Sequence, residues 1–228
     1  MKSSQLERPV LAVDVVIFTL EQACLHVLLH RRTEDPFRDA WALPGVAVRV
    51  DETLERAARR ALREKVQWSS EIQSSIYLEQ LATFDALYRD PRGRTVSVAY
   101  MGLCRTMPEA GEDIMWKPVT DIPKGSLPFD HYAIFDTAVR RLRGKLRYTN
   151  IAKGLLPETF RIEDIQEVYE AILRQKLNRT NFRIKLLKIH LIEQVRILND
   201  AVGEHGGRPP HLYRFTQDLV EVVDREFL

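Results

Sequence analysis

The residues most able to do chemistry lie between Trp41 and Trp68, where charged side chains recur at helical spacing. A helix that holds Mg²⁺ for diphosphate hydrolysis needs several carboxylates from adjacent turns, because Mg²⁺ takes oxygen ligands. Positions 61, 64 and 65 share one side of the expected helix and read Ala61, Glu64 and Lys65. Only one of the three is a carboxylate, and a lysine cation would compete with a metal. We therefore expect no catalytic residue and no metal site here.

A second distinctive segment, residues 176–190, is basic and contains no acidic residue. Residues 1–136 hold 17 Lys and Arg against 20 Asp and Glu, a net charge of −3, whereas residues 137–228 hold 17 against 12, a net charge of +5. A local basic element suits a nucleic-acid backbone. A solvated helix face would explain the charge equally well.

The segment around Glu64 is predicted to be a helix within an α/β domain. Residues 53–65 place Leu and Ala at helical spacing, with Glu and Arg between them. Two aliphatic runs before it, 9–20 and 25–30, predict a hairpin of core strands. We expect further strands at 77–84, 95–103 and 116–119, and a second amphipathic helix at 130–143. Residues 1–146 are assigned to this domain.

After residue 146 the pattern changes to helices. Residues 162–174 predict an amphipathic helix, and Asn178 is the expected N-cap of another that runs to about Leu191. Strands at 195–198 and 212–215 would pair across a Gly-rich and Pro-rich tip, 203–210, before a last helix at 217–227. Two helices followed by a hairpin are typical of a winged helix, to which we assign residues 147–228.

The composition indicates a soluble globular protein. The chain has 228 residues, 45% of them apolar and 29% charged. Cys24 and Cys104 are too few for a disulfide framework and lack zinc spacing, so we expect a reducing cytoplasm. No apolar segment is long enough to be a secretion signal or to span a membrane.

The stretch from Trp41 to Trp68 resembles the Nudix box, the loop-helix-loop motif of enzymes that hydrolyse nucleoside diphosphates linked to another group. Positions that match the Nudix pattern are Glu52, Arg60, Leu62 and Glu64; those that depart from it are Val46 and Gln67 in place of Gly, and Ala61 and Lys65 in place of Glu. The departures imply that hydrolysis is lost. Glu52 with Arg56, and Arg60 with Glu64, have the spacing of helical salt bridges, and we favour this structural role for Arg56.

A nucleotide pocket that no longer cleaves its ligand can serve as a sensor. The segments 78–84 and 90–100 resemble the corresponding part of Nudix proteins that recognise ADP-ribose. Arg49 and Arg94 could clamp a diphosphate, or could simply be surface charges. Aromatic rings could stack on adenine, although Trp41 fits a core as well. The candidate effector-binding residues are Phe37, Trp41, Arg49, Glu52, Arg60, Glu64 and Arg94.

Over nearly its whole length the chain is similar to the Nudix-related transcriptional regulator family, NrtR. The similar segments, in order, are ERPVLAVD, DPRGRTVSVAY, LPFDH, RLRGKLRYTNIAKGLLPETF, NFRIKLL and RPPHLYRF. The resemblance implies an α+β protein with an N-terminal Nudix-like α/β/α sandwich, built on a mixed sheet and without hydrolase activity, and a C-terminal winged helix-turn-helix. It further implies a homodimer that represses genes of NAD biosynthesis and salvage, needs no cofactor, and releases double-stranded operator DNA on binding ADP-ribose or a related NAD metabolite. Some relatives respond to other effectors, including sugars, so the effector stays open.

The second C-terminal helix is the expected DNA reader. With Phe182 facing the core, Ile184 and Leu187 lie nearly opposite, so we expect the helix to be packed on two sides. Arg and Asn read guanine and adenine edges, and Lys contacts phosphates. The base-reading candidates are Arg179, Thr180, Asn181 and Arg183; the phosphate candidates are Lys185 and Lys188, and Arg208 is either a wing contact or a plain surface charge.

A function of a different class is an active Nudix pyrophosphatase that acts on ADP-ribose and uses its C-terminal extension only to dimerise. Release of AMP from ADP-ribose with Mg²⁺ or Mn²⁺ separates the two hypotheses. Ala61, Lys65 and the basic segment 176–190 favour the regulator.

Overall fold

The computed structural model describes residues 8–195 and 211–223. Contacts within the chain define two compact units. The first comprises the residues up to Thr19 together with His26–Val139, and the second comprises Leu20–Leu25 together with the residues from Arg140 onward. Each unit is described by itself below.

The first unit is built on a mixed seven-stranded sheet with the order β3-β2-β1-β6-β5, to which β4 adds beside β1 and β7 beside β2. β1 and β6 run parallel, and the other registered pairs are antiparallel. Residues 13–19 of β1 are all buried, and they are apolar except for Asp14 and Thr19. The strands are β1 Val10–Glu21, β2 Cys24–Arg31, β3 Trp41–Ala42, β4 Gly45–Ala47, β5 Tyr77–Phe84, β6 Thr95–Leu103 and β7 Ile114–Pro118.

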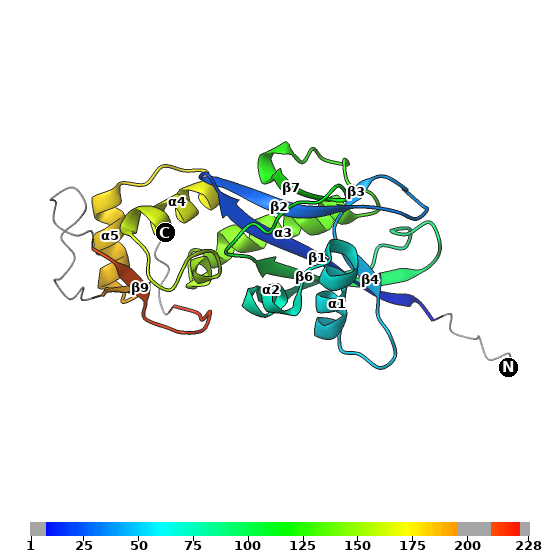
Figure 1. Cartoon of the computed structure of the whole chain (residues 1–228), viewed down its shortest axis with the longest axis horizontal. Helices are drawn as coiled ribbons and strands as arrows, with labels where there is room; N and C mark the ends of the chain where they lie inside the picture. The colour runs from blue at the N-terminus through cyan, green and yellow to red at the C-terminus, as the bar shows by residue number, and fades with distance from the viewer. Residues whose placement is uncertain (1–7, 196–210, 224–228) are drawn as a thin grey trace. The chain divides into compact units, whose positions relative to one another are not determined.

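Helices cover both faces of this sheet (Figure 1). Alternate residues of β1 point to opposite faces. Ile17 belongs to the cluster that packs against α1 (Leu54–Val66), whereas the Phe18 ring lies 6.5 Å from that of Phe135 in α3 (His131–Lys145). The α/β/α sandwich and the mixed sheet are confirmed. A short helix, α2 (Ser70–Ser75), follows α1, and the 3₁₀ turn η1 (Val119–Asp121) follows β7.

The start and the face of α1 follow from its sequence. The Thr53 side chain accepts a hydrogen bond from the backbone N–H of Arg56 and caps the helix, and Gln67 ends it in a left-handed conformation. Ala57, Ala58 and Ala61 are fully buried. These small side chains let the helix backbone lie close to the sheet.

The second unit has the helix-turn-helix and hairpin of a winged helix. It contains the 3₁₀ segment η2 (Ile151–Leu155), α4 (Ile162–Leu173), α5 (Arg179–Lys188), and the antiparallel pair β8 (Ile192–Gln194) and β9 (Tyr213–Phe215). Asn178 caps α5 as predicted, accepting from the Asn181 N–H at 3.0 Å. The Tyr169 and Phe182 rings, 5.0 Å apart, join α4 to α5 in the core.

Three C-terminal predictions need correction. The helix expected at 217–227 is wrong for residues 217–223, because the Asn150 side chain bonds the backbone of Leu219 and Glu221 and Val222 pairs with Thr149 as an isolated bridge. The first strand of the hairpin lies at 192–194 rather than 195–198, of which 196–198 lie outside the described residues. α5 ends at Lys188, earlier than expected, because His190 has a positive φ of 56°.

No helix among the described residues is long and apolar enough to cross a membrane.

Candidate functional site

A cavity of about 980 Å³ opens in the first unit. This volume lies within the range of small-molecule sites. Eight Arg and Lys side chains line it against three acidic ones, Asp14, Glu34 and Asp90. Three further acids, Glu52, Glu64 and Asp130, pair with the lining arginines Arg60, Arg49 and Arg89, and a net positive charge remains that favours an anionic ligand. Guanidinium groups match phosphate oxygens in geometry. The eight cations are Arg8, Arg32, Arg49, Arg60, Lys65, Arg89, Arg92 and Arg94.

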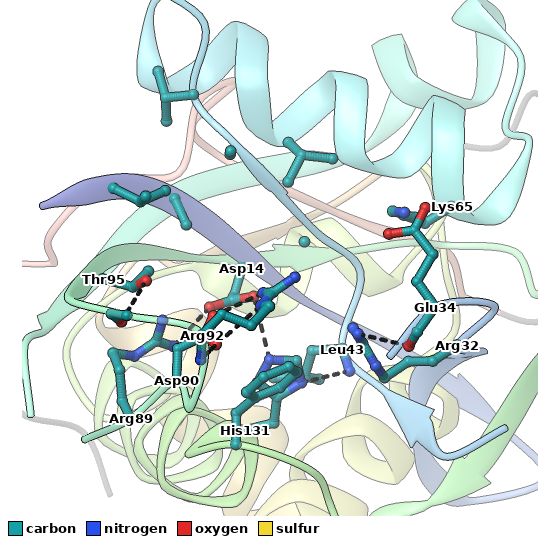
Figure 2. A pocket seen from close by; sticks show the side chains of 18 of the residues that line it. Asp14, Arg32, Glu34, Leu43, Lys65, Arg89, Asp90, Arg92, Thr95 and His131 are labelled. Carbon is teal, nitrogen blue, oxygen red and sulfur yellow. Dashed lines mark hydrogen bonds and ion pairs between the residues drawn. The ribbon is translucent and has the colours of Figure 1, made fainter. Parts of the chain in front are cut away.

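A buried carboxylate on β1, Asp14, organises one wall of the cavity (Figure 2). It accepts hydrogen bonds from Ser97 Oγ at 2.6 Å and Arg89 Nη2 at 3.1 Å, and it lies 3.4 Å from His131 Nε2. Burial acts to raise the pKa of Asp14, but His131, Ser97 and Arg89 lower it by more, to about 2. Arg89 also grips Asp130 through two bonds of 2.6 and 2.8 Å. This network ties β1, β6 and the start of α3 together.

Two histidines at the cavity have their tautomers set by backbone hydrogen bonds. The Leu43 N–H donates to His131 Nδ1 at 3.1 Å, so the ring proton sits on Nε2 and faces Asp14. His30 Nδ1 lies 3.1 Å from the carbonyl oxygen of Arg31 and must donate to it, which leaves His30 Nε2 as an acceptor. Burial lowers the pKa of His30 to about 4. His30 is therefore neutral at pH 7.

The carboxylates of the altered Nudix helix are held by arginines. Arg60, only 7% exposed, bonds Glu52 at 2.5 and 3.0 Å, Glu64 at 3.1 Å and the carbonyl oxygen of Ala47 at 2.7 Å. Arg49 reaches the second oxygen of Glu64 at 3.3 Å. The hydrogen bonds from Arg60 lower the pKa of Glu52 to about 2. Glu52 is therefore ionised at pH 7, and both Glu52 and Glu64 pair with arginines of the same chain.

The two residues that stand where the Nudix pattern has Glu, Ala61 and Lys65, lie in different surroundings. Ala61 is fully buried in the core against the sheet, whereas Lys65 lines the cavity. Among residues 8–195 and 211–223, no three His, Cys, Asp or Glu side chains are grouped as metal ligands would be. The predicted Arg60–Glu64 pair is confirmed, but the Glu52–Arg56 pair is wrong because Arg60 occupies both oxygens of Glu52.

The predicted effector residues are only partly brought together. Arg49, Arg60 and Arg94 line the cavity, and Glu52 and Glu64 lie beside it in the grip of Arg60. The Arg94 guanidinium donates to the carbonyl oxygens of Asp85 and Ala86, at 2.7 and 3.2 Å. Trp41 lies on β3, where it pairs with Arg31 of β2, and it is not among the lining residues.

An aromatic residue that we did not select, Phe129, lines the cavity. The Phe37 ring is not among the lining residues, but it meets the Phe129 ring edge-on at 4.9 Å. The Arg32 and Arg92 guanidinium groups lie 4.9 and 5.6 Å from the centre of the Phe129 ring. A ring flanked by two cations suits a base next to phosphates.

The other lining residues that we did not select had weak sequence signals. Asp14 interrupts an apolar strand, Arg92 lies in the DPRGR segment, and His131 follows Phe129 in LPFDH. Their roles depend on contacts between segments about 40 to 115 residues apart, which no local spacing reveals.

The DNA-reading candidates lie together on α5. Asn181, Lys185 and Lys188 are exposed on one face, Thr180 is exposed, and Arg183 is half-buried. Arg179 is exposed and pairs with Glu163 of α4. Ile184 is 51% exposed, so the expectation that α5 is packed on two sides is wrong: only Phe182 and Leu186 are buried. Arg208 lies outside the described residues.

Both parts of the chain match known domain families. The NUDIX domain model matches residues 8–138 and the NrtR DNA-binding winged helix domain model matches residues 152–215. The chain is 34% identical to the ADPR responsive transcriptional repressor NtrR of Acinetobacter baylyi, over 94% of this chain and 85% of that protein. Its structure is similar to that of Shewanella oneidensis NrtR complexed with a 27mer DNA (31% identity, TM-score 0.72, covering 90% and 93% of the two chains). It is also similar to the NUDIX domain of Shewanella oneidensis NrtR complexed with ADP ribose (34% identity, TM-score 0.50, covering 62% of this chain and 94% of that one).

The cationic cavity on a Nudix-like sandwich, the basic helix of a winged helix-turn-helix and these matches agree. The chain belongs to the NrtR family of Nudix-related transcriptional regulators.

Proposed function

We propose that this protein is a cytoplasmic repressor of genes for NAD biosynthesis or salvage. It binds double-stranded operator DNA as a homodimer, and it releases that DNA when ADP-ribose or a related NAD metabolite fills the cavity. Residues 1–146 sense the effector and residues 147–228 bind DNA. The observation that carries the proposal is the cavity with eight cations against three acids, in a chain that also presents a basic helix.

The effector is held by charge and by stacking. Arg49, Arg92 and Arg94 donate to the diphosphate, and Phe129, in contact with Phe37, offers its ring to the adenine. Lys65 adds a cation where catalysis would need a carboxylate. The ligand is bound without being cleaved, because Glu52 and Glu64 are paired with Arg60 and Arg49.

The DNA is read by α5. Thr180, Asn181 and Arg183 reach base edges, and Lys185 and Lys188 contact phosphates. Arg179 joins them by exchanging Glu163 for DNA, and Arg208 is assigned to the wing.

We expect α3 to take part in the response to the effector. Its first residue, His131, bonds Leu43 and faces Asp14 at the cavity. Near its other end, Arg143 Nε donates to the carbonyl oxygen of Ile172 in α4, at 3.0 Å. An effector that shifts His131 is therefore expected to disturb the start of α3.

The test is a gel-shift titration with the DNA upstream of this protein's own gene and with random DNA of equal length. We expect preference for the upstream DNA, and at least about tenfold weaker binding with saturating ADP-ribose, within the usual range of allosteric coupling. Equal affinity for both DNAs at micromolar protein would overturn the proposal.

The enzymatic alternative is tested in the same samples. With Mg²⁺ or Mn²⁺ present, we expect no AMP above the protein-free control. Robust turnover of ADP-ribose would show that the cavity is an active site and not a sensor.

A further inference from the structure

We propose that Ile184 reads the 5-methyl group of a thymine in the operator and so determines sequence specificity. This inference rests on the proposed role of α5 as the DNA-reading helix. Ile184 has a large apolar side chain that is half exposed, although α5 has a separate buried face.

Ile184 lies at the centre of the polar face of α5. Asn181, Ile184, Lys185 and Lys188 have the spacing i, i+3, i+4 and i+7, which places them on one side of a helix. The buried residues, Phe182 and Leu186, occupy another side. The side chain of Ile184 therefore projects among an amide and two ammonium groups.

The neighbours of Ile184 decide what chemistry it can meet. A protein partner that buried this isoleucine in an apolar interface would also have to desolvate Lys185 and Lys188, which is costly without paired acids. DNA meets both requirements, because its phosphates pair with Lys185 and Lys188 while a base edge can offer an apolar group to Ile184. The apolar group that base edges display in the major groove is the thymine methyl.

The inference also agrees with Asn181, one turn earlier. Asparagine donates to and accepts from an adenine edge in bidentate fashion. The two side chains together predict that each half-site contains an A·T pair at the position facing this part of α5.

The experiment replaces each thymine of the operator, one at a time, with deoxyuridine, which lacks only the methyl group. Burying one methyl contributes enough that we expect about threefold to fivefold weaker binding at one position in each half-site. Ile184→Ala should lose this sensitivity, binding thymine and uracil DNA within about 1.5-fold, while Ile184→Val should keep most of it. Leu219→Ala, an exposed apolar residue of the same unit that lies off α5, is the matched control and should keep the full effect.

Several outcomes would overturn the inference. One is that uracil replaces every thymine without effect on binding by the unaltered protein, and another is that Ile184→Ala keeps the full sensitivity. If Ile184→Ala weakened thymine and uracil DNA equally and also dissociated the dimer in light scattering, Ile184 would be a subunit contact. Sequence-specific binding that is insensitive to uracil refutes this inference alone, whereas absence of any sequence preference refutes the proposed function as well.

Discussion

The buried Arg89 network offers a quantitative test of what holds the cavity together. Arg89 is 4% exposed and makes bonds of 2.6 and 2.8 Å to Asp130 and 3.1 Å to Asp14. Arg89→Met keeps much of the side-chain volume but leaves the buried Asp14 without this guanidinium. Removing one partner of a buried ion pair costs about 3–5 kcal/mol, so we expect a loss of that size in the free energy of unfolding at pH 7.

The pH dependence separates this charge effect from a packing effect. The pKa of Asp14 is about 2 in the native protein, below its ordinary value of 3.8, so its contribution is complete above pH 3.8 and is lost as the pH falls toward 2. In Arg89→Met the pKa of Asp14 rises, because an opposite charge has been removed. As the pH falls, Asp14 is protonated in the variant before it is protonated in the unaltered protein, and this removes the uncompensated buried charge of the variant. The difference in the free energy of unfolding between the two proteins therefore shrinks on acidification.

The assay is urea unfolding followed by tryptophan fluorescence at pH 7 and at pH 3.5, below the ordinary pKa of Asp14. All three tryptophans, Trp41, Trp68 and Trp116, lie in the first unit, so the signal reports that unit. Arg38→Met is the matched control: its ion pair with Asp35 spans 3.8 Å and is exposed, so we expect a change below about 1 kcal/mol. A loss below about 1 kcal/mol for Arg89→Met, or a difference that grows in acid, would show that the ion pairs of Arg89 do not stabilise the first unit.

Three further predictions concern the affinity for ADP-ribose, the stability of the first unit in acid, and the effect of ADP-ribose on DNA binding. Arg49→Ala and Arg94→Ala should each weaken ADP-ribose binding about tenfold or more in calorimetry, because each removes a charge-assisted contact to phosphate; unchanged affinity would exclude the residue from the site. The stability of the first unit should fall by about 3 kcal/mol between pH 6.5 and 4, because the native pKa of His30 is about 4 and the unfolded chain binds the proton first. His30→Asn should flatten that slope, and an unchanged slope would assign it to another group. Arg143→Ala should leave ADP-ribose affinity within about twofold but reduce the effect of ADP-ribose on DNA binding, since the bond to Ile172 is lost; an intact response would exclude this bond from the coupling path.

The elements with strong local signals could be predicted from the sequence. The strands at 77–84 and 95–103 have the predicted bounds, and the Asn178 cap forms as expected. The C-terminal helix expected from residue 217 does not form over 217–223, because the Asn150 side chain bonds the backbone there from about 70 residues away. Local periodicity contains no information about such a contact.

The candidate site could be predicted only where one segment provides it. Arg49, Arg60 and Arg94 lie in or beside recognisable motifs and line the cavity. Asp14, Arg89 and His131 come from three segments, and only the packing of β1 against α3 brings them together. The exposure of Ile184 was also missed, since spacing gives the angle between two side chains but not which of two apolar faces is buried.

In the proposed function, one cavity controls DNA affinity without consuming its ligand. The most direct measurement is the dissociation constant for the upstream DNA with and without ADP-ribose, with AMP quantified in the same samples in the presence of Mg²⁺. We predict at least about tenfold weaker DNA binding and AMP no higher than in the protein-free control. Unchanged DNA affinity together with steady AMP release would contradict this function.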